Sequence, residues 1–517
     1  MTATLAPVLE RNLFSALRAA FPADLDSAAI ETDDGLCYSW GDIERATAML
    51  ANLLDSLELP AASRIAVQVE KSVEAALLYL ATLRAGHVFV PLNTAYQSAE
   101  MAYFIGNAQP AVVVCTGANF GWLSKIAFTA GVQHVFTLDA DRSGSLLQRA
   151  AHCSDQHVPA VRGGADLAAI LYTSGTTGRS KGAMLSHANL LSNAMVLKDY
   201  WGWRPGDVLI HALPIFHVHG LFVALHGALL NGSTILWQGR FDTAQVLRWM
   251  PRATVFMGVP TMYVRLLADA SLSREAAGAM RLFISGSAPL LIETFQDWQR
   301  RTGHTILERY GMSETAMLTS NPYHAEAGVR RGGTVGFPLP GVDLRVVDDA
   351  GAAVPTGEIG GIQVRGPNVF QGYWQMPEKT AEELRPDGWF ITGDLGTRDA
   401  EGYVQIVGRQ KDLVISGGFN VYPKEVELLL DEAPGVLESA VVGLPHPDFG
   451  EAVFAVLVPR PGVTLDAEAV LASIADRLAR YKQPKAAVVL AELPRNTMGK
   501  VQKAQLRADH AGWFSRQ

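Results

Sequence analysis

The chain has 517 residues, too many for a single hydrophobic core, so we expect at least two domains. With 49% hydrophobic and 18% charged residues it has an ordinary globular composition, which excludes a largely disordered chain. The 43 basic and 51 acidic residues give a formal net charge of −8, so we expect no binding of nucleic acid or of an anionic membrane.

Cysteine usage and the longest apolar runs indicate the compartment. Cys37, Cys115 and Cys153 are an odd, scattered set, typical of a reducing environment and not of a zinc framework. The first 21 residues contain Glu10 and lack a cleavage pattern, so they favour an amphipathic helix over a signal peptide. The apolar runs are too short to cross a bilayer. We therefore expect a cytoplasmic protein without membrane spans.

In chain order, short apolar runs rich in β-branched residues alternate with segments of helical length. The strand-like runs are 64–69, 88–90, 111–114, 135–138, 167–172, 234–237, 254–257 and 280–285. Helical patterns at 73–86 and 190–199 lie between them, and this alternation predicts parallel sheets covered by helices.

The pattern changes near residue 340. Strand-like runs at 342–348, 360–365 and 403–407 are separated by Gly, Pro and Asp turns, which predicts a compact antiparallel or barrel-like unit. Beyond 412, helices at 423–431 and 466–478 alternate with strands at 437–442 and 452–459, as in a small α+β domain. We therefore expect an amino-terminal domain at 1–411 and a carboxy-terminal lid at 412–517.

The most informative segment is LAAILYTSGTTGRSKG at 167–182, where a strand of the buried type enters a loop of hydroxyls and glycines. Glycine lets backbone N–H groups close on phosphate oxygens, hydroxyls donate hydrogen bonds, and a lysine adds charge. The loop is not a Walker A motif, because Lys181 lies three positions after Gly178 and no Ser or Thr follows. A plain surface turn is the alternative, but strand entry and Lys181 favour phosphate binding. The candidate phosphate-binding residues are Thr173, Ser174, Gly175, Thr176, Thr177 and Lys181.

TSGTTGRSKG resembles the phosphate-binding signature of the adenylate-forming superfamily, which includes acyl-CoA synthetases, luciferase-like enzymes and nonribosomal adenylation domains. YGMSET at 310–315 is similar to its second signature. The resemblance implies that Tyr310 stacks on adenine, Glu314 holds Mg²⁺ and Thr315 reaches a phosphate. Gly311 and Met312 belong to the same nucleotide-binding segment. A helix cap formed by Ser313 is the alternative for this motif.

Three later segments also resemble family signatures. GWFITGDLG and GRQKDLVISGGFNVYP imply that Asp394 and Arg409 bind the ribose. LPRNTMGKVQK implies that Lys500 is the catalytic lysine, neutralising charge as a carboxylate attacks the α-phosphate. In some relatives this lysine is acetylated, so a lysine acetyltransferase is a further expected partner. The family's hinge falls on Asp412, and the pantetheine channel on Gly417, Gly418 and Phe419.

These segments follow the family's order over nearly the whole chain. The resemblance implies the acyl-adenylate synthetase fold: a large amino-terminal body of layered α/β subdomains with a β-rich subdomain, followed by a small α+β lid. It implies an AMP-forming acid–CoA ligase that uses ATP, Mg²⁺ and coenzyme A in two steps, with Thr173 among its catalytic residues. A hydrolase or dehydrogenase is not supported, because HExxH and GxGxxG are missing and the one GxSxG string lies inside the phosphate loop.

The acid is indicated by LPIFHVHGLFVALH and ISGSAPL, which look most like malonyl-CoA synthetases. A second carboxylate needs a cation, and we expect Arg240 to supply it. His217 is expected to gate the thiol channel, with Ser287 and Met312 shaping the pocket. The resemblance thus favours malonate, or methylmalonate. The alternatives are a short- or medium-chain monocarboxylate–CoA ligase, an adenylation module that loads a carrier protein, and a non-catalytic homologue.

Overall fold

The computed structural model describes residues 11–173 and 180–514. It divides into two compact units: Met1–Asp343 with Arg365–Phe390, and Leu344–Val364 with Ile391–Gln517. The second unit contains the predicted lid and takes in the β-rich segment as well. The boundary expected near residue 412 stays a prediction.

The first unit contains a six-stranded sheet of order β6-β5-β3-β4-β7-β8. Its strands are β3 (Arg64–Gln68), β4 (Val88–Pro91), β5 (Val112–Cys115), β6 (His134–Thr137), β7 (Leu167–Thr173) and β8 (Lys181–Ser186). Parallel pairing joins all neighbours except β7 and β8, which are antiparallel. Apolar residues of α5 (Ser98–Ala108) and α6 (Gly117–Thr129) pack on one face of this sheet. The predicted parallel sheet with helical cover is confirmed here.

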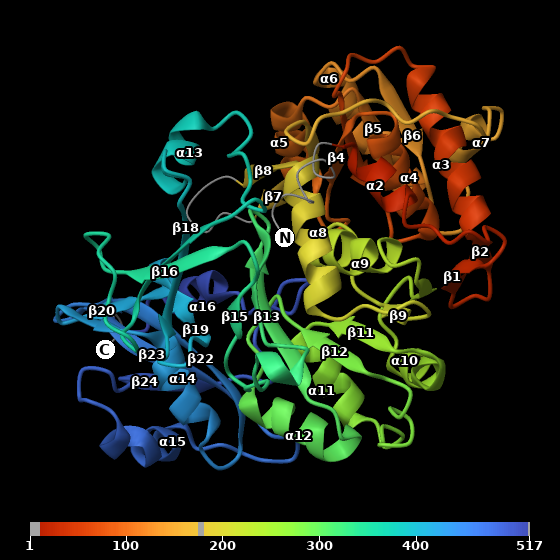
Figure 1. Ribbon diagram of the computed structural model, residues 1–517. Coiled ribbons are helices and arrows are strands. Elements are labelled where there is room, and N and C mark those ends of the chain that lie inside the picture. The colour runs from red at the N-terminus through yellow and green to blue at the C-terminus, as the bar shows by residue number, and fades with distance from the viewer. Residues whose placement is uncertain (1–10, 174–179, 515–517) are drawn as a thin grey trace. The chain divides into compact units, whose positions relative to one another are not determined.

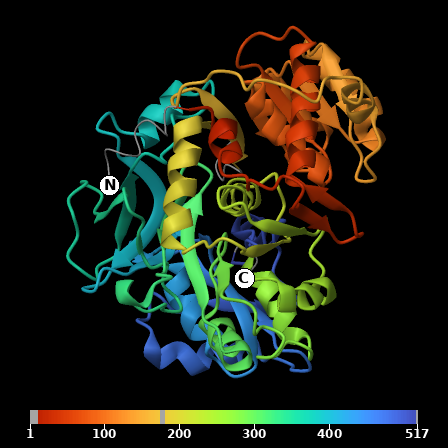
Figure 2. The same ribbon diagram turned by 45° about the vertical axis from the view of Figure 1, so that its right-hand side comes forward.

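A nine-stranded sheet of order β15-β14-β13-β12-β11-β9-β10-β1-β2 forms the rest of this unit. Its strands are β1 (Ala28–Thr32), β2 (Cys37–Ser39), β9 (Val208–His211), β10 (Thr234–Trp237), β11 (Val255–Gly258), β12 (Leu282–Ser285), β13 (Ile306–Met312), β14 (Ala316–Ser320) and β15 (Phe337–Pro338). The associated helices are α8 (His187–Tyr200), the π-helix η1 (His219–Ala224), α9 (Leu225–Leu229), α10 (Thr243–Trp249), α11 (Pro260–Ala268) and α12 (Ile292–Thr302). Helix α8 runs beside β13 and β14 in both views (Figures 1 and 2), where Asn193 hydrogen-bonds the backbone of Met317.

The second unit has two sheets. One has the order β16-β17-β18-β19, and the other has the order β21-β20-β23-β22 with β24 parallel to β23. The strands are β16 (Asp343–Val347), β17 (Gly360–Arg365), β18 (Phe390–Arg398), β19 (Val404–Arg409), β20 (Val414–Ser416), β21 (Phe419–Val421), β22 (Val436–His446), β23 (Gly450–Pro459) and β24 (Ala486–Val489). Helices α14 (Pro423–Asp431), α15 (Ala467–Ile474) and α16 (Lys503–His510) complete it. This is the expected α+β composition. Among the residues described, no helix is both long and apolar enough to cross a membrane.

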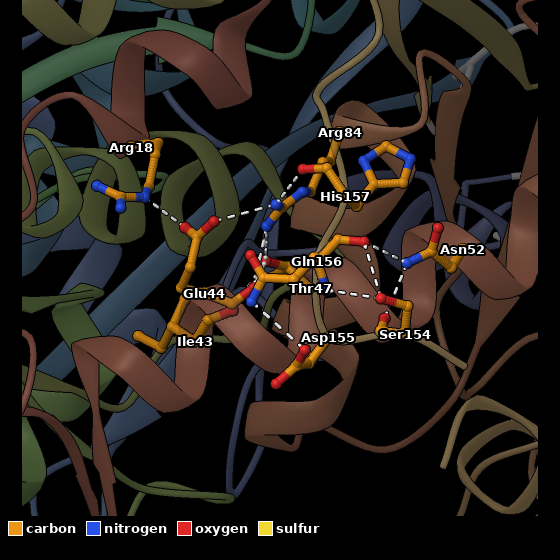
Figure 3. A network of polar contacts seen from close by, with 10 residues as sticks. All are labelled: Arg18, Ile43, Glu44, Thr47, Asn52, Arg84, Ser154, Asp155, Gln156 and His157. Carbon is orange, nitrogen blue, oxygen red and sulfur yellow. Dashed lines mark hydrogen bonds and ion pairs between the residues drawn. The ribbon is translucent and has the colours of Figure 1, made fainter. Parts of the chain in front are cut away.

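A polar network, buried at Arg84, fixes part of the extended segment that leads into β7 (Figure 3). It joins this segment to α3 (Trp40–Asp55) and α4 (Val73–Arg84). Arg84 is only 3% exposed and lies 3.0 Å from the Glu44 carboxylate, and it also donates to the His157 carbonyl oxygen. Asn52 donates to the carbonyl oxygens of Ser154 and Gln156. The network therefore anchors residues 154–157, which precede β7 in the chain.

We expect Arg84→Met to lower the free energy of unfolding by about 2 kcal/mol, because the His157 carbonyl loses its buried donor and the Glu44 carboxylate keeps only Arg18 as a partner. Urea unfolding measures this. Arg45→Met, on α3, is the matched control. The Arg45–Asp42 pair is half exposed, so its loss should change stability by less than about 0.5 kcal/mol. Equal effects of the two substitutions would contradict a structural role for Arg84.

Three buried histidines of the first unit make its stability depend on pH. Burial lowers the pKa of His226 to about 3 and the pKa values of His87 and His187 to about 4. The unfolded chain takes up protons below its ordinary histidine pKa of 6.5, whereas the folded chain does not. Stability is therefore complete above pH 6.5 and falls as the pH drops toward 4, by about 2 kcal/mol for His226 alone at pH 5. We expect His226→Gln to flatten the pH dependence of the urea midpoint, and the exposed His152→Gln to leave it unchanged.

Candidate active site

The two ends of the phosphate loop meet as strand partners. Thr173 ends β7 and pairs in register with Lys181, the first residue of β8. Lys181 is therefore held opposite Thr173 in an antiparallel strand pair. Ser174, Gly175, Thr176 and Thr177 lie outside the described residues.

A chain of polar contacts leads from Lys181 to Glu314. The Lys181 ammonium lies 2.7 Å from Glu383 Oε1 on α13 (Pro377–Glu383) and 4.1 Å from the ring centroid of Tyr373. The Tyr373 hydroxyl lies 2.6 Å from Glu383 Oε2 and 3.0 Å from Glu314 Oε1. Burial, and then the charge of Glu314, raises the pKa of Tyr373 well above its ordinary value, so this phenol stays protonated as a donor.

Glu314 suits the role of a magnesium ligand. Its carboxylate is buried, and Mg²⁺ is commonly held by one or two carboxylates together with substrate phosphates and water. Among the described residues, no cluster of three or more His, Cys, Asp or Glu side chains forms a metal cage. A single carboxylate that would share the ion with a nucleotide fits this donor set.

The YGMSET motif forms a tight β-hairpin and not a helix start. Tyr310 and Met312 end β13, Glu314 and Thr315 lie in the turn, and β14 begins at Ala316. A Cβ atom added at Gly311 would lie 2.0 Å from the Ala316 carbonyl oxygen, so only glycine fits this close approach. The helix-cap alternative for Ser313 is therefore wrong, since strands flank the turn on both sides.

The segments expected to form the acyl pocket bring His219, His217 and Ser287 together. His219 begins the π-helix, and its backbone N–H donates to His217 Nδ1 over 3.3 Å. Ser287 Oγ lies 3.3 Å from His219 Nδ1, and its backbone has the left-handed φ of +72°. Burial lowers the pKa of His219 well below its ordinary value, so this ring is neutral. A π-helix and a non-glycine residue with positive φ, such as Ser287, are both frequent at functional sites.

Two arginines differ sharply in environment. Arg240, expected to bind the second carboxylate, is 88% exposed and lies 3.6 Å from Glu70. Arg309, a residue to which the sequence motifs assign no role, is 3% exposed on β13, next to Tyr310. The signal for Arg309 was a charged residue within the strand that enters YGMSET.

The second unit carries the remaining candidates. Asp394 is buried on β18, and Arg409, its strand partner on β19, places Nε 2.9 Å from its carboxylate. Asp412 pairs with Arg507 at 2.8 Å. Gly417 and Gly418 form the β20–β21 turn with left-handed φ values of +59° and +84°, and Phe419 begins β21. The pair of Asp394 and Arg409 is thus pre-formed.

Lys500 lies at the end of a tight turn. The side chain of Asn496 accepts hydrogen bonds from the backbone N–H groups of Met498 and Lys500, both at 3.0 Å. The Asn496 N–H donates to the Lys500 carbonyl, and Gly499 has a φ of +73°. The turn fixes the lysine backbone and leaves its side chain exposed.

Two models of known protein families match the chain. Residues 18–374 match the model of the AMP-binding enzyme family, and residues 425–500 match the model of the AMP-binding enzyme C-terminal domain. The chain is an AMP-binding enzyme. The adenylate-forming family expected from the ordered motifs, and the acyl-adenylate synthetase fold, are confirmed.

Individual relatives of this AMP-binding enzyme cover almost its whole length. The ATP-bound crystal structure of MatB from Rhodopseudomonas palustris is 53% identical, covers 97% of this chain and 99% of its own, and superposes with a TM-score of 0.94. The malonate–CoA ligase of Arabidopsis thaliana is 32% identical over 96% of this chain and 89% of its own length. The feruloyl-CoA synthase of an Amycolatopsis species is 35% identical over 92% of this chain and 94% of its own. Relatives that are 32% and 35% identical to this chain thus act on different acids, so sequence identity in this range does not identify the acid.

Proposed function

We propose that this enzyme is an ATP-dependent malonate–CoA ligase that works through malonyl-AMP in the cytoplasm. The observation that carries the ligase reaction is the similarity to CoA ligases over 92% or more of the chain, covering both the AMP-binding region and the C-terminal domain. The pocket chemistry supports the acid. Buried His219 and the neighbouring His217 make the candidate acyl site more polar than a fatty-acid tunnel requires.

In the first step, a carboxylate oxygen of malonate attacks the α-phosphorus of ATP and pyrophosphate leaves. We assign Lys181 and Thr173, with Ser174, Gly175, Thr176 and Thr177, to the phosphates. Tyr310 is assigned to adenine, and the Asp394–Arg409 pair to the ribose. Lys500 is assigned to the charge that develops in the transition state. The chemistry that Mg²⁺ supplies when bound is neutralisation of phosphate charge, and Glu314 is the carboxylate proposed to hold it.

In the second step, the thiolate of coenzyme A attacks the carbonyl carbon of malonyl-AMP, and AMP leaves. We assign Gly417, Gly418 and Phe419 to the pantetheine channel, His217 to its gate and Asp412 to the hinge between the two steps. The carboxy-terminal lid would begin at this hinge. Acetylation of Lys500 would remove its charge and stop the first step, so Lys500 is also the proposed site of control by a lysine acetyltransferase.

A pyrophosphate-release screen tests the proposal. Malonate, methylmalonate, acetate, butyrate, octanoate and benzoate are compared, each with and without coenzyme A. We expect the highest kcat/KM with malonate, and multiple turnovers only with coenzyme A. A preferred monocarboxylate would establish the alternative ligase. Turnover that coenzyme A does not increase would indicate a carrier-loading module instead.

A further inference from the structure

Arg309 occupies an unusual place in the nine-stranded sheet. In the register of β12 and β13, Ile284 lies opposite Leu307 and Ser285 opposite Glu308. Gly286 and Arg309 are the next residues along and share one face of the sheet. A Cβ atom added at Gly286 would lie 2.4 Å from Arg309 Cζ. The guanidinium therefore fills the space that a side chain at position 286 would take.

The guanidinium of Arg309 is buried with its binding edge unused. Nε and Nη2 are both inaccessible, and neither has a hydrogen-bond partner among the residues that the structure describes. These two nitrogens direct their N–H bonds to the same side, in the fork that matches the two oxygens of a carboxylate. Arg84 offers a contrast within the same unit. It is equally buried, and its Nε also has no partner among the described residues, but both of its terminal nitrogens are bonded, to Thr47, His157 and the Glu44 carboxylate.

Burial without a counter-charge is unfavourable for Arg309. Desolvation lowers the pKa of its guanidinium from 12.5 to about 9, and the Tyr263 hydroxyl only partly opposes this. A buried cation of this kind is expected to have an anionic partner. The described residues supply no such partner at Nε and Nη2, so this edge of the guanidinium suits an anionic ligand.

His219 offers a second donor near the same place. The positive charge of Arg309 is among the causes that lower the pKa of His219, so the two groups are close enough to interact. His219 Nε2 is buried without a partner among the residues described, while Nδ1 lies 3.3 Å from Ser287 Oγ. If the Ser287 hydroxyl donates to Nδ1, the ring proton is on Nε2. Neutral His219 then presents an N–H group without adding a second buried charge.

We propose that Arg309 and His219 form the receptor for the distal carboxylate of malonate, with Arg309 binding it through the Nε–Nη2 fork. This assignment rests on the proposed function and names the side chains that select the acid. A monocarboxylate of similar size would leave the guanidinium buried and unpaired, so the same residues that bind malonate also reject propionate. The exposed Arg240, already beside Glu70, has no such desolvated edge to offer.

The test compares malonate with propionate, which carries a methyl group in place of the second carboxylate. In Arg309→Met, we expect kcat/KM for malonate to fall about 100-fold or more, and kcat/KM for propionate to stay within about threefold or to rise. Arg248→Met, at an exposed arginine of the same unit, is the matched control, and it should keep malonate kinetics within about twofold. A larger loss with malonate in Arg240→Met than in Arg309→Met would overturn the receptor. A sulfonate in place of the distal carboxylate, as in sulfoacetate, should follow malonate, because it also presents oxygens to the fork.

Arg309→Lys gives a second variant that retains the charge but loses the fork. We expect the KM for malonate to rise about tenfold, with propionate activity and the unfolding midpoint unchanged. Malonate kinetics within threefold of wild type in both variants would overturn the receptor. Equal losses with malonate and propionate would also overturn it, since they would indicate a structural role. Wild-type enzyme that activates propionate and not malonate would overturn the proposed function itself, before any variant is compared.

Discussion

Lys500→Ala is expected to reduce malonyl-AMP formation by about 1,000-fold while leaving attack of coenzyme A on supplied malonyl-AMP within a few-fold of wild type. The reason is that negative charge accumulates on the attacking carboxylate and the α-phosphate only in the first step. The second step expels AMP from an anhydride already formed. Because the Lys500 side chain is exposed, its removal should change the free energy of unfolding by less than about 0.5 kcal/mol.

The two half-reactions can be measured separately. Pyrophosphate release from ATP and malonate reports the first step, and AMP release from malonyl-AMP and coenzyme A reports the second. Lys485→Ala, at another exposed lysine of the same unit, is the control and should affect neither rate. Equal loss of both half-reactions in Lys500→Ala would show that the lysine does not act on the adenylation transition state.

The secondary structure of the body could be predicted closely because β-branched runs and helix signals agree there. The runs at 111–114 and 135–138 differ by one residue from β5 and β6, of which β5 is fully buried and β6 is buried only at Phe136. The helix expected at 423–431 has the observed bounds of α14, with Pro423 at its first turn. Where local conformational preference and burial favour the same element, the sequence is sufficient to predict that element.

The local geometry of the site could not be predicted, because it depends on contacts between distant segments. YGMSET is compatible with a helix cap, yet pairing of β13 with β14 makes it a hairpin turn. The π-helix that begins at His219 has no period that distinguishes it from an ordinary helix in the sequence. Each of these depends on the packing of the nine-stranded sheet.

Which arginine is buried near the candidate pocket also depends on contacts between distant segments. In the sequence, Arg240 is a cation in a loop near the expected pocket, and its role stays a prediction. Burial of Arg309 follows from the register of β12 and β13, which no local pattern specifies. One clue was present in the sequence: LERYGMSE places two charged residues inside a strand, and charged residues are rarely buried without a partner.

The contacts from Lys181 through Glu383 and Tyr373 to Glu314 connect the phosphate loop to the candidate metal ligand. The carboxylate of Glu383 joins the Lys181 ammonium to the Tyr373 hydroxyl, and that hydroxyl is also within hydrogen-bond distance of Glu314. In the proposed reaction, a nucleotide would draw Lys181 toward phosphate and bring Mg²⁺ to Glu314. The network therefore gives each of the two groups a partner within the protein.

Glu314→Gln separates the metal-binding role of this residue from its place in the network. The amide oxygen of Gln can still accept the Tyr373 hydrogen bond, so the fold should be retained, but the negative charge offered to Mg²⁺ is lost. We expect pyrophosphate release to fall about 100-fold or more at saturating ATP, with the dependence on Mg²⁺ shifted to higher concentration.

Tyr373→Phe is the matched control, because it removes the hydrogen bond and keeps the carboxylate. It should lower the same rate less than about tenfold, without moving the Mg²⁺ dependence. An unchanged Mg²⁺ dependence in Glu314→Gln would remove Glu314 from the metal site. A shift of equal size in both variants would instead mean that Tyr373 orients the carboxylate that holds the ion.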